Sequence, residues 1–390
     1  MGPLSGRTPD LSQLTGAAHR RRSLLITVAA LIAVAVAVAG TLLVLRPGSD
    51  GATASTTTDR QARAAARNFL ATYVDSDGRV VRRDQGGDTV SEGQAYAMLA
   101  AVTAGDKPAF DRTWSWSQQN LSRSDGLLSW KWSDGTVTDP SSAADADLDA
   151  AWALALAGKE FGDAQDTRDG RTLATAILRH ETVSTPVGQV LVAGSWATTA
   201  PYPVNPSYFA PAAYAELRAL TGDPTWAKVA DSSRTLLISL VRDRHLPPDW
   251  AQVGADGTVT ASNAPDGAGP QFGDDAGRVP VWYASSCARA DRQVAASLEP
   301  LLDDSPAGRQ SAAYDLAGSP QVGYDVPLGQ VAAAAAAGAA GDSSAVAKGL
   351  ADAATLAAQQ KTYYGSAWLA LGRTLLTTDI LGSCPTQGDS

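Results

Sequence analysis

The pattern of apolar and polar residues predicts helices along almost the whole chain. Apolar side chains recur at the three- and four-residue spacing that places them on one face of a helix. Ala, the strongest helix former, dominates these segments. Two segments, 189–194 and 245–253, are candidates for short strands. The predicted helices cover residues 61–74, 92–104, 108–121, 147–161, 170–181, 207–221, 224–241, 293–304, 322–340, 343–360 and 364–380. Short and long connections alternate between them, which predicts an all-α fold with concentric rings of helices.

An apolar run near the N-terminus predicts a membrane anchor. Residues 23–46 are almost entirely apolar, and a helix from Leu24 to Leu45 would be roughly 33 Å long, enough to cross a bilayer. The tail 1–22 is basic, so the positive-inside rule places it in the cytoplasm and the rest of the chain outside. We therefore expect a single-pass protein of the cell membrane with an extracytoplasmic domain. A cleaved signal peptide and a secreted protein are the alternative, although the apolar core of such a peptide is usually about 7–15 residues.

A single folded domain follows this segment. Residues 47–58 are rich in Gly, Ser and Thr, which is typical of a flexible linker. Residues 59–382 contain no second low-complexity break, and residues 383–390 form a short tail. Cys287 and Cys384 are the two cysteines. In an oxidising compartment they would form a disulfide, and two free buried thiols are the alternative.

The net charge and the residue composition limit the classes of ligand that the protein is expected to bind. The formal net charge is −9, which would repel nucleic acid and favours a neutral polymer or a small molecule as ligand. Trp residues outnumber Phe residues, 10 to 5, and exposed Trp rings would offer flat faces for sugars, although large core side chains explain them as well. Only His180 and His245 lie in the domain, without metal-ligand spacing, and no phosphate-binding loop occurs. We expect neither a metal nor another cofactor.

Three acidic segments carry the candidate chemistry: SEGQAYAML at 91–99, AADADLDAAWALALAGKEF at 143–161 and GDDAGRVP at 273–280. Each has a structural explanation, because an acid in a first helical turn is stabilised by the dipole and an acid beside Arg278 forms a surface ion pair. Carboxyl groups that converge from distant segments are also what hydrolysis of a glycosidic bond requires, since one protonates the leaving oxygen and another activates water.

Together the three segments resemble glycoside hydrolase family 8, and the resemblance extends over residues 60–380. It implies an (α/α)6 barrel, with Glu92 as general acid and Asp275 as general base beside Arg278. It also implies that Asp145 binds the sugar at the cleavage point, with Asp147 as its companion. The chain departs from the family pattern at Ala144, Ala150 and Asp274. Asp274 stands where the family usually has Tyr.

Further similar blocks lie at 110–132, 205–214, 246–252 and 363–372, and they suggest Trp130, Trp132, Tyr208 and Tyr364 as sugar contacts. The resemblance implies an endo-acting enzyme that hydrolyses a β-1,4-linked glucan with inversion. A chitosanase or xylanase on the same fold is one alternative, and a non-catalytic polysaccharide-binding protein is another. The oligomeric state stays open.

Overall fold

The computed structural model describes residues 49–303 and 310–385. The chain divides into two compact units, 1–56 and 57–390, and the boundary falls within the first described helix, Ser49–Tyr73. The predicted tail 1–22 and membrane segment 23–46 lie outside the described residues. Within the described ranges, no helix combines the length and the apolar character needed to span a bilayer.

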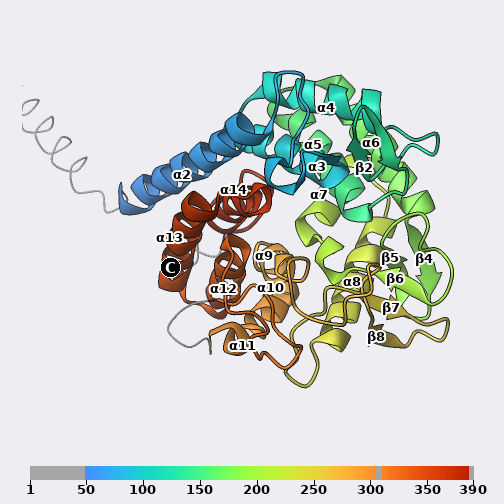
Figure 1. Cartoon of the computed structure of the whole chain (residues 1–390), viewed down its shortest axis with the longest axis vertical. Helices are drawn as coiled ribbons and strands as arrows, with labels where there is room; N and C mark the ends of the chain where they lie inside the picture. Colours follow the sequence, from blue (N-terminus) through green and yellow to red (C-terminus); the bar gives the residue numbers. More distant parts are fainter. Residues whose placement is uncertain (1–48, 304–309, 386–390) are drawn as a thin grey trace, which may run out of the picture. The chain divides into compact units, whose positions relative to one another are not determined.

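Thirteen α-helices occur in the described residues: α2 (Ser49–Tyr73), α3 (Ser91–Ala104), α4 (Lys107–Leu121), α5 (Ala144–Glu160), α6 (Ala164–His180), α7 (Pro211–Thr221), α8 (Thr225–Leu240), α9 (Arg278–Ala284), α10 (Arg289–Ala296), α11 (Glu299–Asp303), α12 (Pro327–Ala340), α13 (Ser343–Gln360) and α14 (Tyr363–Thr377). Six of them, α3, α5, α7, α9, α12 and α14, contact one another in that order, and α14 closes a ring by contacting α3. Figure 1 shows these helices around a common centre.

An outer helix packs against each helix of this ring. The pairs are α3 with α4, α5 with α6, α7 with α8, α9 with α10 and α12 with α13. Helix α2 packs against the start of α14, where the rings of Phe69 and Tyr363 lie 6.0 Å apart. Inner and outer helices thus alternate along the chain, in the concentric arrangement that the sequence predicts.

Small side chains allow the inner helices to pack on both sides. Helix α5 is buried from Ala144 to Ala157, and Ala occupies half of these positions. Outer helices such as α13 bury only one face, with Val346, Leu350, Ala353 and Ala357 at helical spacing. Burial of apolar area is the main favourable contribution to the fold. Large aromatic rings fill the centre of the ring, where Trp282 lies 5.9 Å from Trp152 and 5.2 Å from Trp368.

Three small antiparallel sheets depart from a purely helical fold. They are built from β1 (Thr89–Val90), β2 (Lys131–Ser133) and β3 (Thr136–Asp139), from β4 (Thr182–Thr185) and β5 (Gly188–Leu191), and from β6 (Tyr202–Val204), β7 (Ala251–Val253) and β8 (Val259–Ala261). Thr89 of β1 pairs with Trp132 of β2, and Tyr202 of β6 pairs with Val253 of β7. All of these strands lie in connections that lead from an outer helix to the next inner helix. They therefore surround the N-terminal ends of the inner helices.

The structure departs most from the predicted helices in three places. Helix α2 begins at Ser49, so most of the segment predicted as a linker is helical. A nucleated helix adds a hydrogen bond for each further residue, so the predicted helix at 61–74 extends toward the N-terminus. The predicted helix 293–304 is two short helices, α10 and α11. Helix α9 was not predicted, because its seven residues contain Pro280 and follow a Gly-rich loop.

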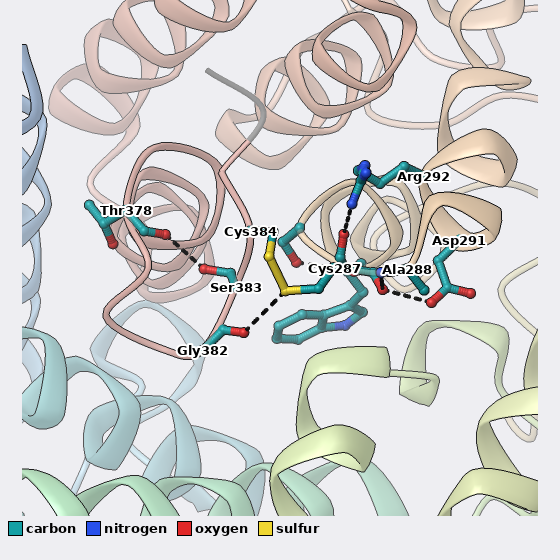
Figure 2. The surroundings of a disulfide bond; sticks show 11 residues. Cys287, Ala288, Asp291, Arg292, Thr378, Gly382, Ser383 and Cys384 are labelled. Atoms are coloured by element: carbon teal, nitrogen blue, oxygen red, sulfur yellow. Dashed lines mark hydrogen bonds between the residues drawn. A yellow bond between two sulfur atoms is a disulfide. The ribbon is translucent and has the colours of Figure 1, made fainter. Parts of the chain in front are cut away.

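A disulfide joins Cys287 to Cys384, across 97 positions of sequence. It ties the end of the chain to the segment that follows α9 (Figure 2). The backbone N–H of Cys384 donates to the backbone carbonyl of Ser285. The hydroxyl of Ser383 donates to the backbone carbonyl of Thr378. The bond and its neighbours therefore fix the C-terminal end of the short inner helix α9.

Candidate active site

The N-terminal ends of three inner helices bring the acidic segments together. Glu92 is the second residue of α3, Asp145 is the second residue of α5, and Arg278 is the first residue of α9. Asp275 lies in the loop just before α9. The convergence that the sequence only suggests is therefore a property of the fold, because all three helices start at the same end of the ring.

The guanidinium of Arg278 is the centre of this cluster. Its side chain is 2% exposed, and it contacts three carboxylates: Glu92 at 3.1 Å, Asp145 at 2.9 Å and Asp275 at 2.7 Å. The same nitrogen that contacts Glu92 and Asp145 also donates to the hydroxyl of Tyr96, at 3.0 Å. A buried guanidinium needs such partners to offset its lost hydration. Three carboxylates around one cation leave an excess of negative charge if all of them are ionised.

Glu92 is the carboxyl that this excess affects most clearly. Burial raises the pKa of Glu92 to about 7, and the negative charges of Asp145 and Asp275 act in the same direction, while Arg278 opposes them. The other oxygen of Glu92 faces the hydroxyl of Tyr363, at 3.5 Å. The Glu92 side chain is still 19% exposed, so it can reach a bound molecule. A carboxyl with these properties can hold a proton near neutral pH and release it.

Asp275 lies in a more polar environment. Its side chain is 33% exposed, one oxygen accepts from Arg278, and the other accepts from the amide of Asn205 at 2.8 Å. Both partners are N–H donors, so both oxygens of the Asp275 carboxylate are engaged. Asn205 is itself fixed, because its amide oxygen accepts from the backbone and the hydroxyl of Ser207.

Asp145 lies beneath these two residues. It is 6% exposed, and one of its oxygens accepts from the backbone N–H of Ala146 while the other accepts from Arg278. Burial raises the pKa of Asp145, and Arg278 opposes that shift. Asp145 lies in the first turn of α5, whereas the N-cap position belongs to Ala143.

The residues next to Glu92 explain the local sequence. The side chain of Gln94 accepts from the backbone of Val80 and donates to the carbonyls of Gly78 and Thr113, and so connects α3 to the preceding loop and to α4. A Cβ at Gly93 would lie 2.8 Å from the hydroxyl oxygen of Tyr363. Glycine at this position therefore allows α14 to approach the start of α3.

A cavity of about 480 Å³ opens over Glu92, Asp145 and Asp275. Trp130, Trp196, Tyr208 and Trp250 contribute aromatic rings to its lining. Trp130 is 37% exposed and Trp196 is 47% exposed. Rings with apolar faces open to solvent suit the flat faces of sugar rings. The guanidinium of Arg278 lies 5.4 Å from the ring of Tyr208, which links this wall to the charged cluster.

Three predicted substrate contacts lie elsewhere or have another partner. Asp147 is fully buried, accepts from the backbone of Leu128 and does not line the cavity, because it points away from the open side of α5. Trp132 packs against Trp116 at 5.4 Å and is likewise outside the cavity lining. The hydroxyl of Tyr364 donates to the carbonyl of Asp274, at the edge of a separate, smaller cavity.

Sequence reasoning missed several residues of the site. Tyr96, Asn205 and Trp250 fall inside blocks that were noted for other residues, so inspection of every polar or aromatic position in those blocks would have found them. Trp196 stands outside all the blocks, and only its exposure in the structure identifies it. Within residues 49–303 and 310–385, no group of three or more His, Cys, Asp or Glu side chains could hold a metal ion.

Comparison with known proteins assigns a family. Glycosyl hydrolases family 8 matches residues 45–378. A probable endoglucanase of Novacetimonas hansenii is 35% identical over 223 residues, 55% of this chain and 64% of that protein. An endoglucanase of Cellulomonas uda is 30% identical over 231 residues, 57% of this chain and 63% of that protein. These matches thus span less than two thirds of the relatives' length.

Solved structures agree in fold. The endo-beta-1,4-glucanase CMCax from Acetobacter xylinum has 28% identity and a TM-score of 0.68, and the match covers 81% of this chain and 98% of that one. A beta-1,3-1,4-glucanase from Paenibacillus sp. X4 has 22% identity and a TM-score of 0.73, covering 83% and 92%. With the family match extending over most of the sequence, this chain belongs to glycosyl hydrolases family 8.

Proposed function

We propose that this protein is an endo-acting hydrolase of β-1,4-linked glucan with an (α/α)6 barrel fold. The observation that carries the proposal is the pairing of Glu92, whose pKa is raised to about 7, with Asp275 across one guanidinium. Two carboxyl groups with different protonation at one pH are what acid-base cleavage of a glycosidic bond needs. The names of the relatives, endoglucanase and endo-beta-1,4-glucanase, support the substrate class.

In this proposal Glu92 is the general acid and Asp275 is the general base. Glu92 gives its proton to the glycosidic oxygen as the bond to the anomeric carbon breaks. Asp275 takes a proton from a water molecule, whose oxygen forms the new bond from the opposite face of the sugar. The product then has the inverted configuration, and the two carboxyl groups return to their starting states by exchanging protons with solvent.

Asp145 has a different role in this proposal. It lies deeper than Glu92 and Asp275 yet lines the same cavity, so its carboxylate would contact the sugar at the cleavage point. Its negative charge also helps to keep the proton on Glu92. Trp130, Trp196 and Trp250 would stack on sugar rings on either side of that point.

We also propose that the catalytic domain works outside the cytoplasm, attached to the membrane through residues 23–46. The apolar sequence of that segment and the basic tail before it support the topology. The disulfide between Cys287 and Cys384 supports an oxidising compartment.

One observation favours a second candidate, the hydrolysis of chitosan. A cavity of about 220 Å³ adjoins the base, and Asp249, Asp266, Asp274 and Asp275 line it. Asp274 is the residue that stands where the family usually has Tyr. Carboxylates at this position would attract the protonated amino groups of a cationic polysaccharide.

Release of reducing ends from carboxymethylcellulose, chitosan and xylan by the full chain tests these alternatives. We expect the highest kcat/KM on carboxymethylcellulose, with a rapid loss of viscosity, because an endo-acting enzyme cuts inside chains. Preference for chitosan would favour the second candidate. Binding of a polysaccharide without any product would contradict hydrolysis and favour a non-catalytic binding protein.

A further inference from the structure

We propose that Asp249 is a positioning residue that holds the loop carrying Asp275. The inference rests on the proposed function, in which Asp275 is the general base. Asp249 lies in the connection between α8 and β7, within the segment 246–252 that is similar to the family. No sugar contact is needed for this role.

Asp249 forms hydrogen bonds with backbone groups on both sides of Asp275 in the sequence. One carboxylate oxygen accepts the backbone N–H of Gly273 at 2.9 Å and that of Ala276 at 2.8 Å. The backbone N–H of Asp249 donates to the carbonyl of Gln271 at 2.7 Å. Asp275 lies between the two tethered N–H groups, so Asp249 restricts the backbone to which the base is attached.

Gly273 allows this close approach. A Cβ built at Gly273 would lie 2.7 Å from the second carboxylate oxygen of Asp249 and 3.0 Å from the side-chain nitrogen of Gln271. Any larger residue would push the carboxylate away from the loop. Glycine at position 273 therefore allows the loop 273–276 to lie against the carboxylate of Asp249.

The remaining contacts of Asp275 depend on the loop path. Its carboxylate accepts from Arg278 and from Asn205, and its backbone carbonyl accepts the N–H of Arg278 at 3.0 Å. These bonds set the direction of the carboxylate only if the backbone of residues 273–276 stays in place. Loss of Asp249 would also leave the N–H of the buried Ala276 without its acceptor.

Two substitutions separate positioning from charge. Asp249→Ala removes the acceptor, so we expect kcat on carboxymethylcellulose to fall by about 10²-fold, the effect of displacing a reacting group by about 1 Å, with KM within about twofold of wild type. Asp249→Asn keeps an amide oxygen in the same place, and the side chain of Gln271 can turn its oxygen toward the new amide. We expect the kcat of this variant to be within about threefold of wild type, because a neutral amide oxygen can also accept the N–H groups of Gly273 and Ala276.

A matched control lies in the same region of the chain. Asp256 also accepts a backbone N–H, that of Thr258 at 2.9 Å, but on an exposed turn before β8. Asp256→Ala should leave kcat unchanged. Gly273→Ala tests the same tether from the other side and should lower kcat as Asp249→Ala does, even if Asp249→Ala fails to fold.

The outcomes distinguish this inference from the proposed function. Unchanged kcat in folded Asp249→Ala or in Gly273→Ala would overturn the positioning role, as would an Asp249→Asn variant no more active than Asp249→Ala. A raised KM at unchanged kcat would also overturn it, since that pattern indicates a substrate contact. Asp275→Asn is measured in parallel: full activity there would instead refute the assignment of the base.

Discussion

Glu92 and Asp275 contact opposite nitrogens of one guanidinium, that of Arg278, at 3.1 Å and 2.7 Å. They are 183 positions apart in the sequence, so only the closure of the helical ring brings them together. Asp145 shares the nitrogen that binds Glu92. Burial raises the pKa of Glu92, the charges of Asp145 and Asp275 raise it further, and the single positive charge of Arg278 only partly opposes these effects.

Substitution of Glu92 tests its role as the acid. Glu92→Gln has no proton to give, so we expect kcat on cellopentaose to fall by about 10²–10⁴-fold, the usual contribution of general acid catalysis. An aryl cellobioside with a strongly acidic phenol as leaving group needs no protonation, so its rate should fall far less. Initial rates on both substrates measure the difference. Equal losses on the two would contradict the assignment.

The pH profile tests the coupling between Asp145 and Glu92. Activity that needs protonated Glu92 should decline as the pH rises through about 7, where Glu92 ionises. The negative charge of Asp145 disfavours ionised Glu92, so Asp145→Asn should lower the pKa of Glu92 and move the alkaline limb of kcat/KM to lower pH.

Asp139→Asn provides the control for that shift. Asp139 lines the same cavity, but its carboxylate accepts from the backbone of Ser141 and does not contact the Arg278 cluster. We expect its alkaline limb to match wild type. An unchanged limb in Asp145→Asn, or an equal shift in both variants, would show that Asp145 does not set the protonation of Glu92.

Two tryptophans separate substrate binding from packing. Trp196 is 47% exposed on the cavity wall, so Trp196→Ala should raise KM for long cello-oligosaccharides and leave the melting temperature near wild type. Trp132 packs between Trp116 and the guanidinium of Arg79, so Trp132→Ala should lower the melting temperature. Kinetics and thermal unfolding of both variants provide the check, and the reverse pattern would show that Trp132 is the sugar contact.

The disulfide should contribute strongly to stability. A covalent loop of this length lowers the entropy of the unfolded chain, worth roughly 4–5 kcal/mol in the loop-entropy account. The double variant Cys287→Ala and Cys384→Ala should therefore unfold at markedly lower denaturant concentration. A reducing agent should produce the same loss in wild type and none in the variant. Equal stability of the two proteins would show that the bond adds nothing beyond the contacts around it.

The helical pattern was predictable because it is a local property. Ala-rich segments with apolar residues at helical spacing correspond to most of the observed helices, for example 343–360 and helix α13 (Ser343–Gln360). Helix α9 has too few residues for a period to show, and its position is set by packing in the ring. Each three-stranded sheet includes a pairing between distant segments, Thr89 with Trp132 in one and Tyr202 with Val253 in the other, which no local pattern reveals.

The charged residues of the site could be predicted from the sequence, because they stand out in the three acidic segments. Glu92, Asp145, Asp275 and Arg278 lie together as the resemblance implies. Asp147 could not be separated from Asp145 by sequence, because two positions along a helix turn a side chain by about 200° to another face. Whether a Trp is exposed, as Trp196 is, or packed, as Trp132 is, depends on neighbours that the sequence does not place.

The most direct test of the central claim is the configuration of the first product. Time-resolved proton NMR of cellopentaose hydrolysis by the full chain, with Asp275→Asn beside it, follows the anomeric signals before mutarotation. We predict that wild type releases the α-anomer first and that Asp275→Asn releases almost none. Release of the β-anomer, or equal product from the variant, would contradict the account of Glu92 as acid and Asp275 as base.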